Sequence, residues 1–528
     1  MFKIKFKLSP YLEIFSVIYI LIPNFIFFSC WPQIPIAIFL TLLLVISSFL
    51  VIKNLYNDSN NDNTQNKYQQ KFETNLPTIF ICLIGIILWV YFSGIGGFYF
   101  QNGDYEKHNA IFYDLANFDW PLTYLSPASL TSDLSTQKFP MVYYFGYYLT
   151  PTLIEKFTSL AIHEWFILIW SIVGISLVFL WIVKLTNKFT ILSLIFMIFF
   201  SGLDLIGYIL YKGHLPTSFS EHIEYWTWVW QFSSNTTMLN WVPHQIIPAW
   251  ILTPYIIHRV FEKKDISDVF FISSMSLMWT SFISIGLFPF VVIGSLLYFN
   301  KKVFSFQNII AAIFIVPILA LFFISVDSHV THGWVMNIHP KLKFYLWVPI
   351  FIFLEIGIYY LFIYKKIIAI TKNDFKKYSY VIIAFLSLIT VLFYHYGEFN
   401  DLGMRASIPA LCILQIFLWR HLPPLKIWYR SISCYIFFLL FIIGAAAPLM
   451  EMIRSHTNPQ FYIPYISLPY WGRKHIHLTS QYFGKGDSFF FKYIAKQPNE
   501  KSKLQVIPQD VWQRFQMFRR QREEIRSN

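Results

Sequence analysis

The sequence contains little charge. Asp, Glu, Lys and Arg together make up 13% of its 528 residues, whereas about 25% of the residues of a soluble domain are charged. A soluble protein must cover itself with polar surface, so this composition excludes a soluble enzyme, and it excludes a disordered chain as well. The net charge of +13 resembles that of a nucleic-acid-binding protein. In so apolar a chain, however, a basic excess is typical of cytoplasmic loops, and nucleic acid is not an expected partner.

Cysteine is also scarce. The four cysteines lie in or beside apolar runs and form no close pair in sequence, which predicts neither a disulfide framework nor a zinc site. His329, His332 and His339 are too irregularly spaced for a compact ligand set, so no metal and no cofactor is expected. The cysteines are Cys30, Cys82, Cys412 and Cys434.

Apolar residues dominate what is present. Hydrophobic residues make up 56% of the chain and the mean hydropathy is +0.50. Runs such as Ile191–Phe200 and Ile309–Ile324 predict an all-α, polytopic transmembrane helical bundle, since each crossing takes about 20 residues. We expect thirteen spans, near residues 11–29, 34–52, 77–97, 163–184, 189–211, 241–260, 267–283, 284–299, 307–326, 343–364, 379–396, 403–419 and 431–450.

Basic residues set the expected orientation. Lys3, Lys5 and Lys7 precede the first span, which places the N-terminus in the cytoplasm. Of the 41 Lys and Arg residues, the predicted inner segments then hold 21 and the outer loops 7, with 13 in the C-terminal tail. An odd number of spans leaves that tail outside. Abundant Lys, Ile, Asn and Phe are typical of an AT-rich bacterial genome, and hence of a multi-pass protein of the plasma (inner) membrane.

This threading divides the chain into two parts. Residues 1–450 form the transmembrane domain, including a long first outer loop at 98–162, and residues 451–528 form a small extracytoplasmic tail. Residues 267–299 must cross twice in 33 positions, so both helices are short or one is re-entrant. Within the outer loop, the aromatic run Met141–Phe157 is expected to lie flat at the interface, with its tyrosines at headgroup level. Those tyrosines are Tyr143, Tyr144, Tyr147 and Tyr148.

The first outer loop opens with an acidic and basic motif. Asp104 is expected to cap a helix whose first turn holds Glu106 and Lys107. Asp104 and His108 are four residues apart and therefore share one face of that helix. One interpretation is a plain capping pair of acids in a solvated loop. The other is a catalytic carboxylate, because carboxylates near cations at a membrane face can be tuned as bases.

Two later outer segments carry further polar residues. Arg405 begins a span, where it either snorkels outward or holds an anion, since a guanidinium fork matches phosphate oxygens. Glu398 or Asp401 would neutralise Arg405 in the first case. His244 lies at the top of a span and either bonds a phosphate or sugar hydroxyl or is a plain interfacial histidine.

This layout resembles the GT-C superfamily of membrane glycosyltransferases. The resemblance rests on the long early outer loop with flat helices, about a dozen spans, and the motif Asp104-Tyr105-Glu106. This D-x-E form departs from the D-x-D, E-x-D or D-D forms common in that superfamily. The elements G-D-x-x-K-H at 103–108 and N-D-x-x-M-R at 400–405 are also similar to those of some bacterial membrane proteins.

The resemblance implies a reaction. A sugar would pass from a polyprenyl-phosphate-type lipid donor in the membrane to an unidentified acceptor on the outer face of the cell envelope. Asp104 would be the catalytic base, with Glu106 assisting it. The donor phosphate would be bound by Arg405 together with Lys107, His108 or His244, and Glu398 and Asp401 belong to the same predicted site.

Other functions stay open at the level of sequence. A transporter or flippase of a lipid-linked or anionic solute would carry ionisable residues at mid-membrane, and Asp204, Glu355 and Glu13 are the candidates here. An O-antigen polymerase or ligase would rely on a large late outer loop, whereas the large loop of this chain comes early. A non-catalytic membrane scaffold is the last alternative.

Overall fold

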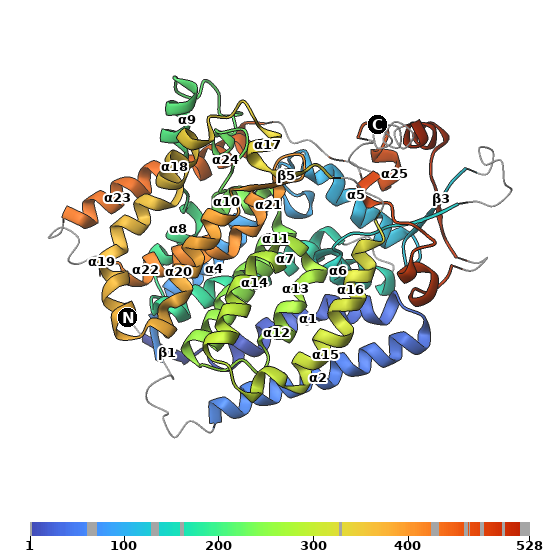
Figure 1. The fold of residues 1–528 in the computed structure, drawn as a ribbon, viewed down its shortest axis with the longest axis horizontal. Helices are drawn as coiled ribbons and strands as arrows, with labels where there is room; N and C mark the ends of the chain where they lie inside the picture. Colours follow the sequence, from blue (N-terminus) through green and yellow to red (C-terminus); the bar gives the residue numbers. More distant parts are fainter. Residues whose placement is uncertain are drawn as a thin grey trace.

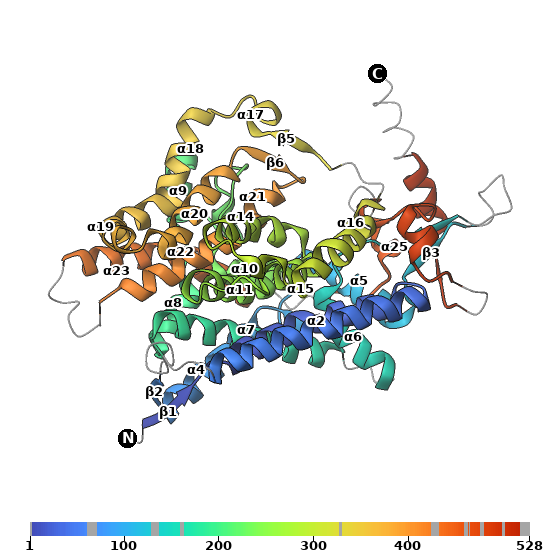
Figure 2. The same ribbon diagram turned by 60° about the horizontal axis from the view of Figure 1, so that its bottom comes forward.

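The computed structural model describes residues 3–60, 71–127, 137–158, 163–326, 330–423, 432–458, 463, 465–475, 480–498 and 502–517. Over these residues the chain forms a bundle of tilted helices with smaller elements at both ends (Figures 1 and 2). Strand β1 (Lys3–Lys7) and helix α25 (Leu468–Trp471) lie at opposite ends of the bundle in both views.

Eight helical segments are long and apolar enough to cross a membrane. They coincide with eight of the predicted spans, which confirms the prediction of a membrane-embedded helical bundle. The count of thirteen, and the side that each loop faces, stay predictions. In chain order the helices of these segments are α1 (Tyr11–Cys30), α2 (Ile34–Asn60), α7 (His163–Thr186), α8 (Ile191–Phe199) with α9 (Asp204–Lys212), α15 (Phe306–Ile310) with η6 (Ala311–Ile315) and α16 (Val316–Ile324), α18 (Phe344–Ile352) with η7 (Phe353–Gly357) and α19 (Ile358–Asn373), α21 (Asp401–Ala406) with α22 (Ile408–His421), and α23 (Ile432–Gly444) with α24 (Ala446–Thr457).

The other predicted spans are also helical, and all of them except the segment Pro243–Glu262 are shorter. Two of their helices, α4 and α20, begin with a side-chain cap. The Asn75 side chain, for example, accepts a hydrogen bond from the Thr78 backbone N–H at 2.9 Å at the start of α4, where Pro77 occupies a position that needs no donor. These helices are α4 (Leu76–Phe92), α11 (Pro243–Ile256) continued by η4 (Ile257–Glu262), α12 (Val269–Ser274), α13 (Ser276–Trp279), α14 (Ser281–Leu297) and α20 (Phe375–Thr390).

Residues 267–299 form a helical hairpin. Thr280 is extended between α13 and α14, and α12 packs back against α14. The two feet of the hairpin lie together, because Lys302 Nζ is 3.4 Å from Asp265 Oδ1. At 1.5 Å per residue, the arm Val269–Trp279 is about 17 Å long, well short of the roughly 30 Å hydrocarbon core. The sequence leaves two alternatives, two short helices or one re-entrant helix, and the choice between them stays a prediction.

The first outer loop and the C-terminal segment fold together. Helices α5 (Asp104–Asn117) and α6 (Gly146–Thr158) lie in the loop, as expected. Between them, β3 (Thr123–Leu125) pairs with β4 (Lys138–Pro140) and, in parallel, with β7 (Gln505–Val506) of the tail. The predicted boundary at residue 450 falls inside α24, and the division of the chain into two parts stays a prediction.

The all-α prediction also needs a correction, because three small sheets are present among the described residues. Each joins segments too short for a sequence pattern to identify as strands. Strand β1 pairs with β2 (Lys71–Asn75), and β5 (His332–Trp334) pairs with β6 (Tyr394–Tyr396). The remaining elements are η1 (Ile95–Gly97), η3 (Ile223–Tyr225), α10 (Asn235–Trp241), η5 (Lys301–Phe304), α17 (Val335–Ile338), η9 (Ser480–Tyr482) and η10 (Phe490–Ile494).

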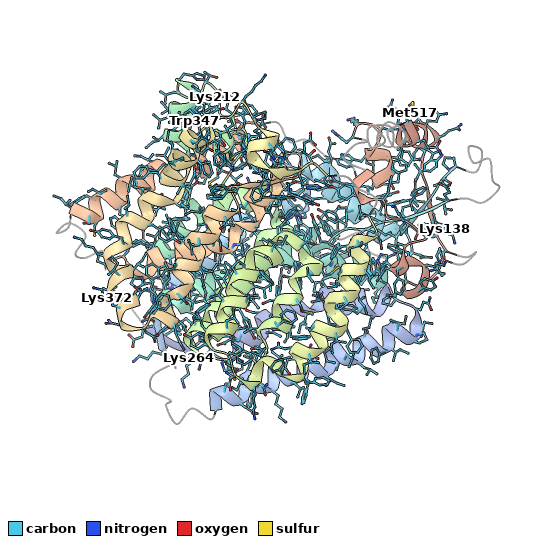
Figure 3. All side chains as sticks on the ribbon, viewed as in Figure 1. Lys138, Lys212, Lys264, Trp347, Lys372 and Met517 are labelled. Atoms are coloured by element: carbon cyan, nitrogen blue, oxygen red, sulfur yellow. The ribbon has the colours of Figure 1, made fainter. Side chains whose placement is uncertain are left out.

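Four labelled lysines mark different parts of the bundle in Figure 3. Lys264 and Lys372, both predicted to be inner, lie toward the lower left, whereas Lys138 and Lys212, both predicted to be outer, lie at the right and at the top. The end with Lys138 also holds α5, α25 and β3 (Figure 1). We refer to it as the α5 end.

Candidate functional site

The site begins at the N-terminus of α5. The Asn102 side chain accepts a hydrogen bond from the Asp104 N–H at 3.0 Å and donates one to the Asn240 carbonyl at 2.7 Å. Asn102 therefore caps this helix and ties it to α10, so the prediction that Asp104 is the capping residue is wrong. The Asp104 carboxylate is left to interact with other groups.

Asp104, Lys107 and His108 share one face of α5. Lys107 Nζ lies 3.8 Å from Asp104 Oδ2, and the Asp104 side chain keeps 35% of its surface exposed while that of Lys107 keeps 10%. Burial would raise the pKa of Asp104, but nearby positive charges, Lys107 first and Arg405 among them, outweigh it, so the pKa lies below its ordinary value. Asp104 is therefore an accessible anion at neutral pH.

Arg405 reaches the same place from α21. Its Nη2 lies 2.8 Å from Asp401 Oδ1, one helical turn earlier, and its guanidinium lies 5.4 Å from the ring centroid of Phe282 at the tip of the helical hairpin. Arg405 Nε is buried and makes no hydrogen bond to any described residue. Of the two predicted neutralising residues, Asp401 is the one that pairs with Arg405. The arginine keeps one donor unused.

The start of α5 and Arg405 of α21 lie near enough for their charges to interact. The charge of Arg405 acts on Asp104, Lys107 and His108 across 300 positions of sequence. Tyr144 lies beside Arg405: burial raises its pKa to about 12, against the opposing effect of the Arg405 charge. The structure thus brings together the predicted residues Asp104 and Arg405.

His108 is a neutral hydrogen-bonding residue. Burial and the Lys107 charge lower its pKa to about 3. Its Nε2 lies 3.3 Å from the Trp241 carbonyl, which can only accept, so Nε2 carries the proton and Nδ1 accepts from the Tyr148 hydroxyl at 2.5 Å. A neutral imidazole does not attract a phosphate by charge, so His108 fits the predicted phosphate-binding role poorly.

His244 packs beside His108, with ring centroids 4.8 Å apart. Its Nε2 contacts Gln245 Nε2 at 3.0 Å, and its Nδ1 is buried without a partner among the described residues. His244 is fully buried, so it is not an interfacial histidine. Four tyrosines surround it at ring-centroid distances of 6.2–6.5 Å: Tyr143, Tyr144, Tyr147 and Tyr148.

The four tyrosines, predicted to lie at headgroup level, pack inside the protein. Tyr143, Tyr147 and Tyr148 are buried and Tyr144 is half-buried. They point inward because the chain turns into α6 at Gly146, where a Cβ would come within 3.0 Å of the Trp279 backbone. That close approach packs the start of α6 onto the helical hairpin, so the tyrosines become the floor of the site.

Glu106 and Glu398 lie outside this cluster. Glu106 follows Asp104 by two residues and therefore faces another side of the helix, where it accepts a hydrogen bond from Trp471 Nε1 at 3.0 Å and lies 3.4 Å from His475 Nε2. It lines a separate cavity of about 690 Å³ beside the C-terminal segment. Glu398 is exposed in the turn that precedes α21.

We name the assembled group the outer cluster: Asp104, Lys107, His108, His244, Asp401 and Arg405, with Tyr143, Tyr144 and Tyr148. Sequence reasoning missed Phe282 and Tyr482, which complete it. The charges of Asp104 and Arg405 both act on Tyr482. For the tyrosines, the sequence signal for burial was the four-residue spacing of Tyr143 with Tyr147 and of Tyr144 with Tyr148. This spacing fits a helix at the membrane interface as well as a helix in the protein core.

Among the described residues, no group of three or more His, Cys, Asp or Glu side chains could hold a metal ion. Comparisons of the chain with protein-family models, with curated proteins and with solved structures find no match. Function must therefore be argued from the outer cluster itself.

Proposed function

We propose that the protein is a membrane glycosyltransferase that moves a sugar from a polyprenyl-phosphate-type donor to an acceptor at the α5 end of the bundle. The observation that carries this proposal is the meeting of an accessible carboxylate, Asp104, with a guanidinium, Arg405, at the end of a lipid-embedded bundle. Sugar transfer from a lipid phosphate requires these two kinds of group on one side of the membrane. The GT-C-like layout of the chain supports the same reaction.

Asp104 is the proposed base. As the acceptor oxygen forms its bond to the anomeric carbon, its proton passes to an Asp104 carboxylate oxygen. At the same time the bond between the anomeric carbon and the phosphate oxygen breaks, and its electron pair leaves with the phosphate. Because nearby cations keep Asp104 ionised, the base is ready to accept the proton at neutral pH.

Arg405 and Lys107 are the proposed phosphate-binding residues. Negative charge grows on the phosphate as the sugar departs, and fixed cations stabilise that charge in the transition state. The unused Nε donor of Arg405 supports this role, since a buried N–H without a partner is costly unless a ligand accepts from it. Asp401 holds the guanidinium in position and is not itself a ligand of an anion.

The test is sugar transfer by the purified chain in proteoliposomes, with a panel of polyprenyl-phosphate sugars as donors. Asp104→Asn keeps the size of the side chain and removes the base, so the rate should fall about a thousandfold. Glu106→Gln is the matched control, and it should retain activity because its carbonyl still accepts from Trp471. Full activity of Asp104→Asn, or an equal loss in both variants, would exclude this mechanism.

One observation favours a second function, transport of a lipid-linked or anionic solute. Asp204 and Glu355 are buried in candidate spans, and Asp204 Oδ1 and Glu355 Oε2 have no hydrogen-bond partner among the described residues. Such a pair is typical of proton-coupled carriers. Asp204→Asn should leave sugar transfer intact if the protein is a transferase. Solute uptake driven by a pH gradient, and lost in Asp204→Asn, would favour the transporter.

A further inference from the structure

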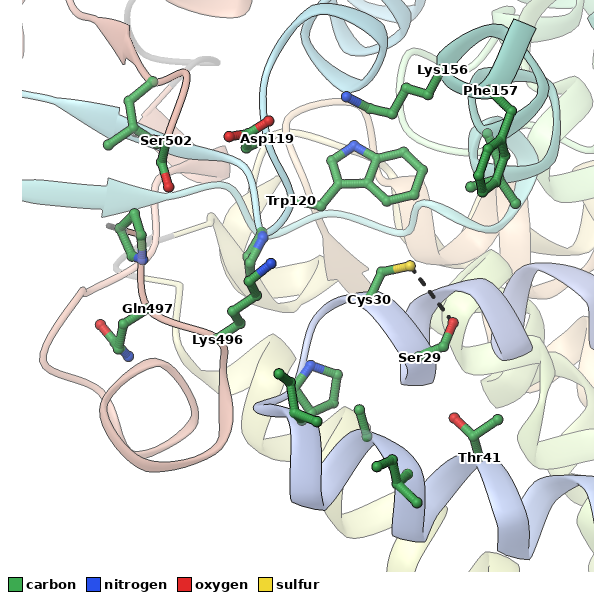
Figure 4. A pocket seen from close by; sticks show the side chains of 18 of the residues that line it. Ser29, Cys30, Thr41, Asp119, Trp120, Lys156, Phe157, Lys496, Gln497 and Ser502 are labelled. Atoms are coloured by element: carbon green, nitrogen blue, oxygen red, sulfur yellow. Dashed lines mark hydrogen bonds between the residues drawn. The ribbon is translucent and has the colours of Figure 1, made fainter. Parts of the chain in front are cut away.

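A second cavity lies at the α5 end, away from the outer cluster. It has a volume of about 920 Å³ and opens between the start of α2, the end of α6, the segment that follows α5 and the C-terminal segment (Figure 4). Nothing in the proposed reaction uses it. One of its walls is apolar and the opposite wall is basic, and this contrast indicates an amphipathic ligand.

One wall is apolar and faces lipid. Ile34, Ile38 and Leu42 line the cavity from α2, four residues apart, and are 70%, 57% and 56% exposed. Helix α2 is a candidate span, with only 33% of its most apolar window buried inside the protein. The stripe therefore continues directly into the surface that contacts hydrocarbon, and an acyl chain can lie along it without leaving the membrane.

The opposite wall is basic. Lys156 Nζ donates to the Phe118 carbonyl at 2.7 Å and lies 5.3 Å from the ring centroid of Trp120, which leaves further ammonium protons for a ligand. Lys496 enters from the C-terminal segment and is exposed. Figure 4 shows both lysines beside Trp120. Asp119 is the one carboxylate among the described lining residues, and its Oδ2 accepts from the Lys503 backbone N–H at 2.9 Å.

An aromatic wall separates this cavity from the outer cluster. Trp31 is fully buried, with its ring centroid 5.1 Å from that of Trp120 and 5.3 Å from that of Phe145. Trp120 lines the cavity, and Phe145 follows Tyr144 of the outer cluster. A lipid in the cavity is therefore not in position to donate a sugar at Asp104.

We propose that this cavity binds an anionic phospholipid, with its phosphate between Lys156 and Lys496 and one acyl chain along Ile34, Ile38 and Leu42. A lysine near a membrane surface attracts anionic lipid and can extend its stem over apolar groups. Because Lys156 belongs to α6 and Lys496 to the C-terminal segment, the bound phosphate joins these two parts. The lipid serves as a structural ligand, independent of the proposed sugar transfer.

The test is native mass spectrometry of the full chain titrated with phosphatidylglycerol or phosphatidylcholine. Wild type should retain phosphatidylglycerol preferentially. Removing each lysine should lower the affinity for phosphatidylglycerol about fivefold. The double variant Lys156→Met/Lys496→Met should therefore bind phosphatidylglycerol more than tenfold more weakly than wild type. The control Lys372→Met/Lys376→Met changes two exposed lysines at the other end of the bundle and should bind like wild type. Equal retention of both lipids, or no loss in the double variant, would overturn the proposal.

Two further arms identify the ligand. Leu42→Trp fills the apolar wall and keeps both lysines, so phosphatidylglycerol should be lost; its full retention would contradict the placement of the acyl chain. Inorganic phosphate should not displace the lipid, because it lacks a chain, and displacement would show a simple anion site instead. A stronger loss of polyprenyl monophosphate than of phosphatidylglycerol in the lysine double variant would assign the cavity to the donor and overturn the phospholipid.

Discussion

Among the arginines that the structure describes, Arg405 is the one with a buried nitrogen that has no hydrogen-bond partner, beside a nitrogen that pairs with a carboxylate. Asp401 holds Nη2, while Nε is buried without a described partner. A lysine at this position would keep the charge but lose the planar fork that suits a phosphate. The role of Arg405 is therefore testable by a substitution that conserves charge.

We predict that Arg405→Lys weakens binding of a polyprenyl monophosphate about tenfold, the order expected for one charged hydrogen bond. Arg473→Lys is the matched control, since Arg473 also pairs with an aspartate, Asp510, at 2.9 Å but lies outside the outer cluster. Binding measured by lipid titration should separate the two variants. Equal affinity of Arg405→Lys and wild type would dismiss the phosphate-binding role.

Asp114 is a second unusual residue of α5, and its role is structural. Its Oδ2 accepts from the Tyr124 hydroxyl at 2.6 Å and from the Leu468 N–H at 2.9 Å, which ties α5 to β3 and to α25. Burial raises the pKa of Asp114 to about 7, although these hydrogen bonds oppose the rise. The folded protein therefore binds a proton at this residue that the unfolded chain releases at lower pH.

Stability should consequently fall as the pH rises from about 4 to about 7, because over this window the folded state holds more protons than the unfolded state. The slope from one such group is at most about 1.4 kcal/mol per pH unit. Asp114→Asn removes the titrating proton and should flatten this part of the profile. Thermal unfolding in detergent at several pH values measures both proteins, and parallel profiles would contradict the assignment.

At the scale of elements, the turn before α21 positions Arg405. Gly397 has φ of +95°, and a Cβ there would lie 2.2 Å from Asp401 Oδ2. Gly213, at the end of α9, has a similar φ of +80° but open space around it. Alanine substitutions at the two glycines therefore distinguish the free-energy cost of backbone strain from the cost of moving the Asp401 side chain.

We expect Gly213→Ala to destabilise the protein by about 1 kcal/mol through backbone strain alone. Gly397→Ala should destabilise it further, by about 1–3 kcal/mol in total, and should also weaken polyprenyl monophosphate binding, since Asp401 no longer holds Arg405. Thermal unfolding measures the stability of both variants, and lipid titration measures their affinity for polyprenyl monophosphate. Unchanged binding in Gly397→Ala would show that Asp401 does not position the arginine.

The sequence predicted some elements better than others, for identifiable reasons. Long apolar runs such as Tyr11–Cys30 leave few alternatives to a span, and the structure has a helix there. The extended residue Thr280 and the two-residue strand β7 depend on tertiary contacts and leave no periodic signal. The four-residue spacing placed Asp104 and His108 on one face correctly, whereas the cap came from Asn102, whose bond to Asn240 no local pattern reveals.

At the scale of the whole molecule, the meeting of Asp104 with Arg405 followed from one inference, that both segments face the same side of the membrane. The contacts of individual side chains could not be predicted. The tyrosines, for example, were expected at the membrane interface and instead form the floor of the site. The orientation of the whole bundle in the membrane also stays a prediction, and it can be measured directly.

We predict that Gly103→Cys reacts with an impermeant maleimide added outside intact cells, and that Lys264→Cys reacts only after the membrane is opened. Gly103 is exposed, with open space around a Cβ, and Lys264 is exposed at the other end of the bundle. Both variants are made in a Cys30→Ser background, because Cys30 is the one cysteine that is not fully buried. The reverse pattern would place the outer cluster in the cytoplasm.

The central claim is that the Asp104 carboxylate removes the acceptor proton while the donor is held by other residues. The single-turnover rate of sugar transfer, measured with donor already bound to wild type and to Asp104→Asn, tests it most directly, because binding no longer contributes to the difference. The account predicts a fall of about a thousandfold in this rate with the same amount of donor bound. A rate within about tenfold of wild type would contradict it, since that is less than the effect of a general base.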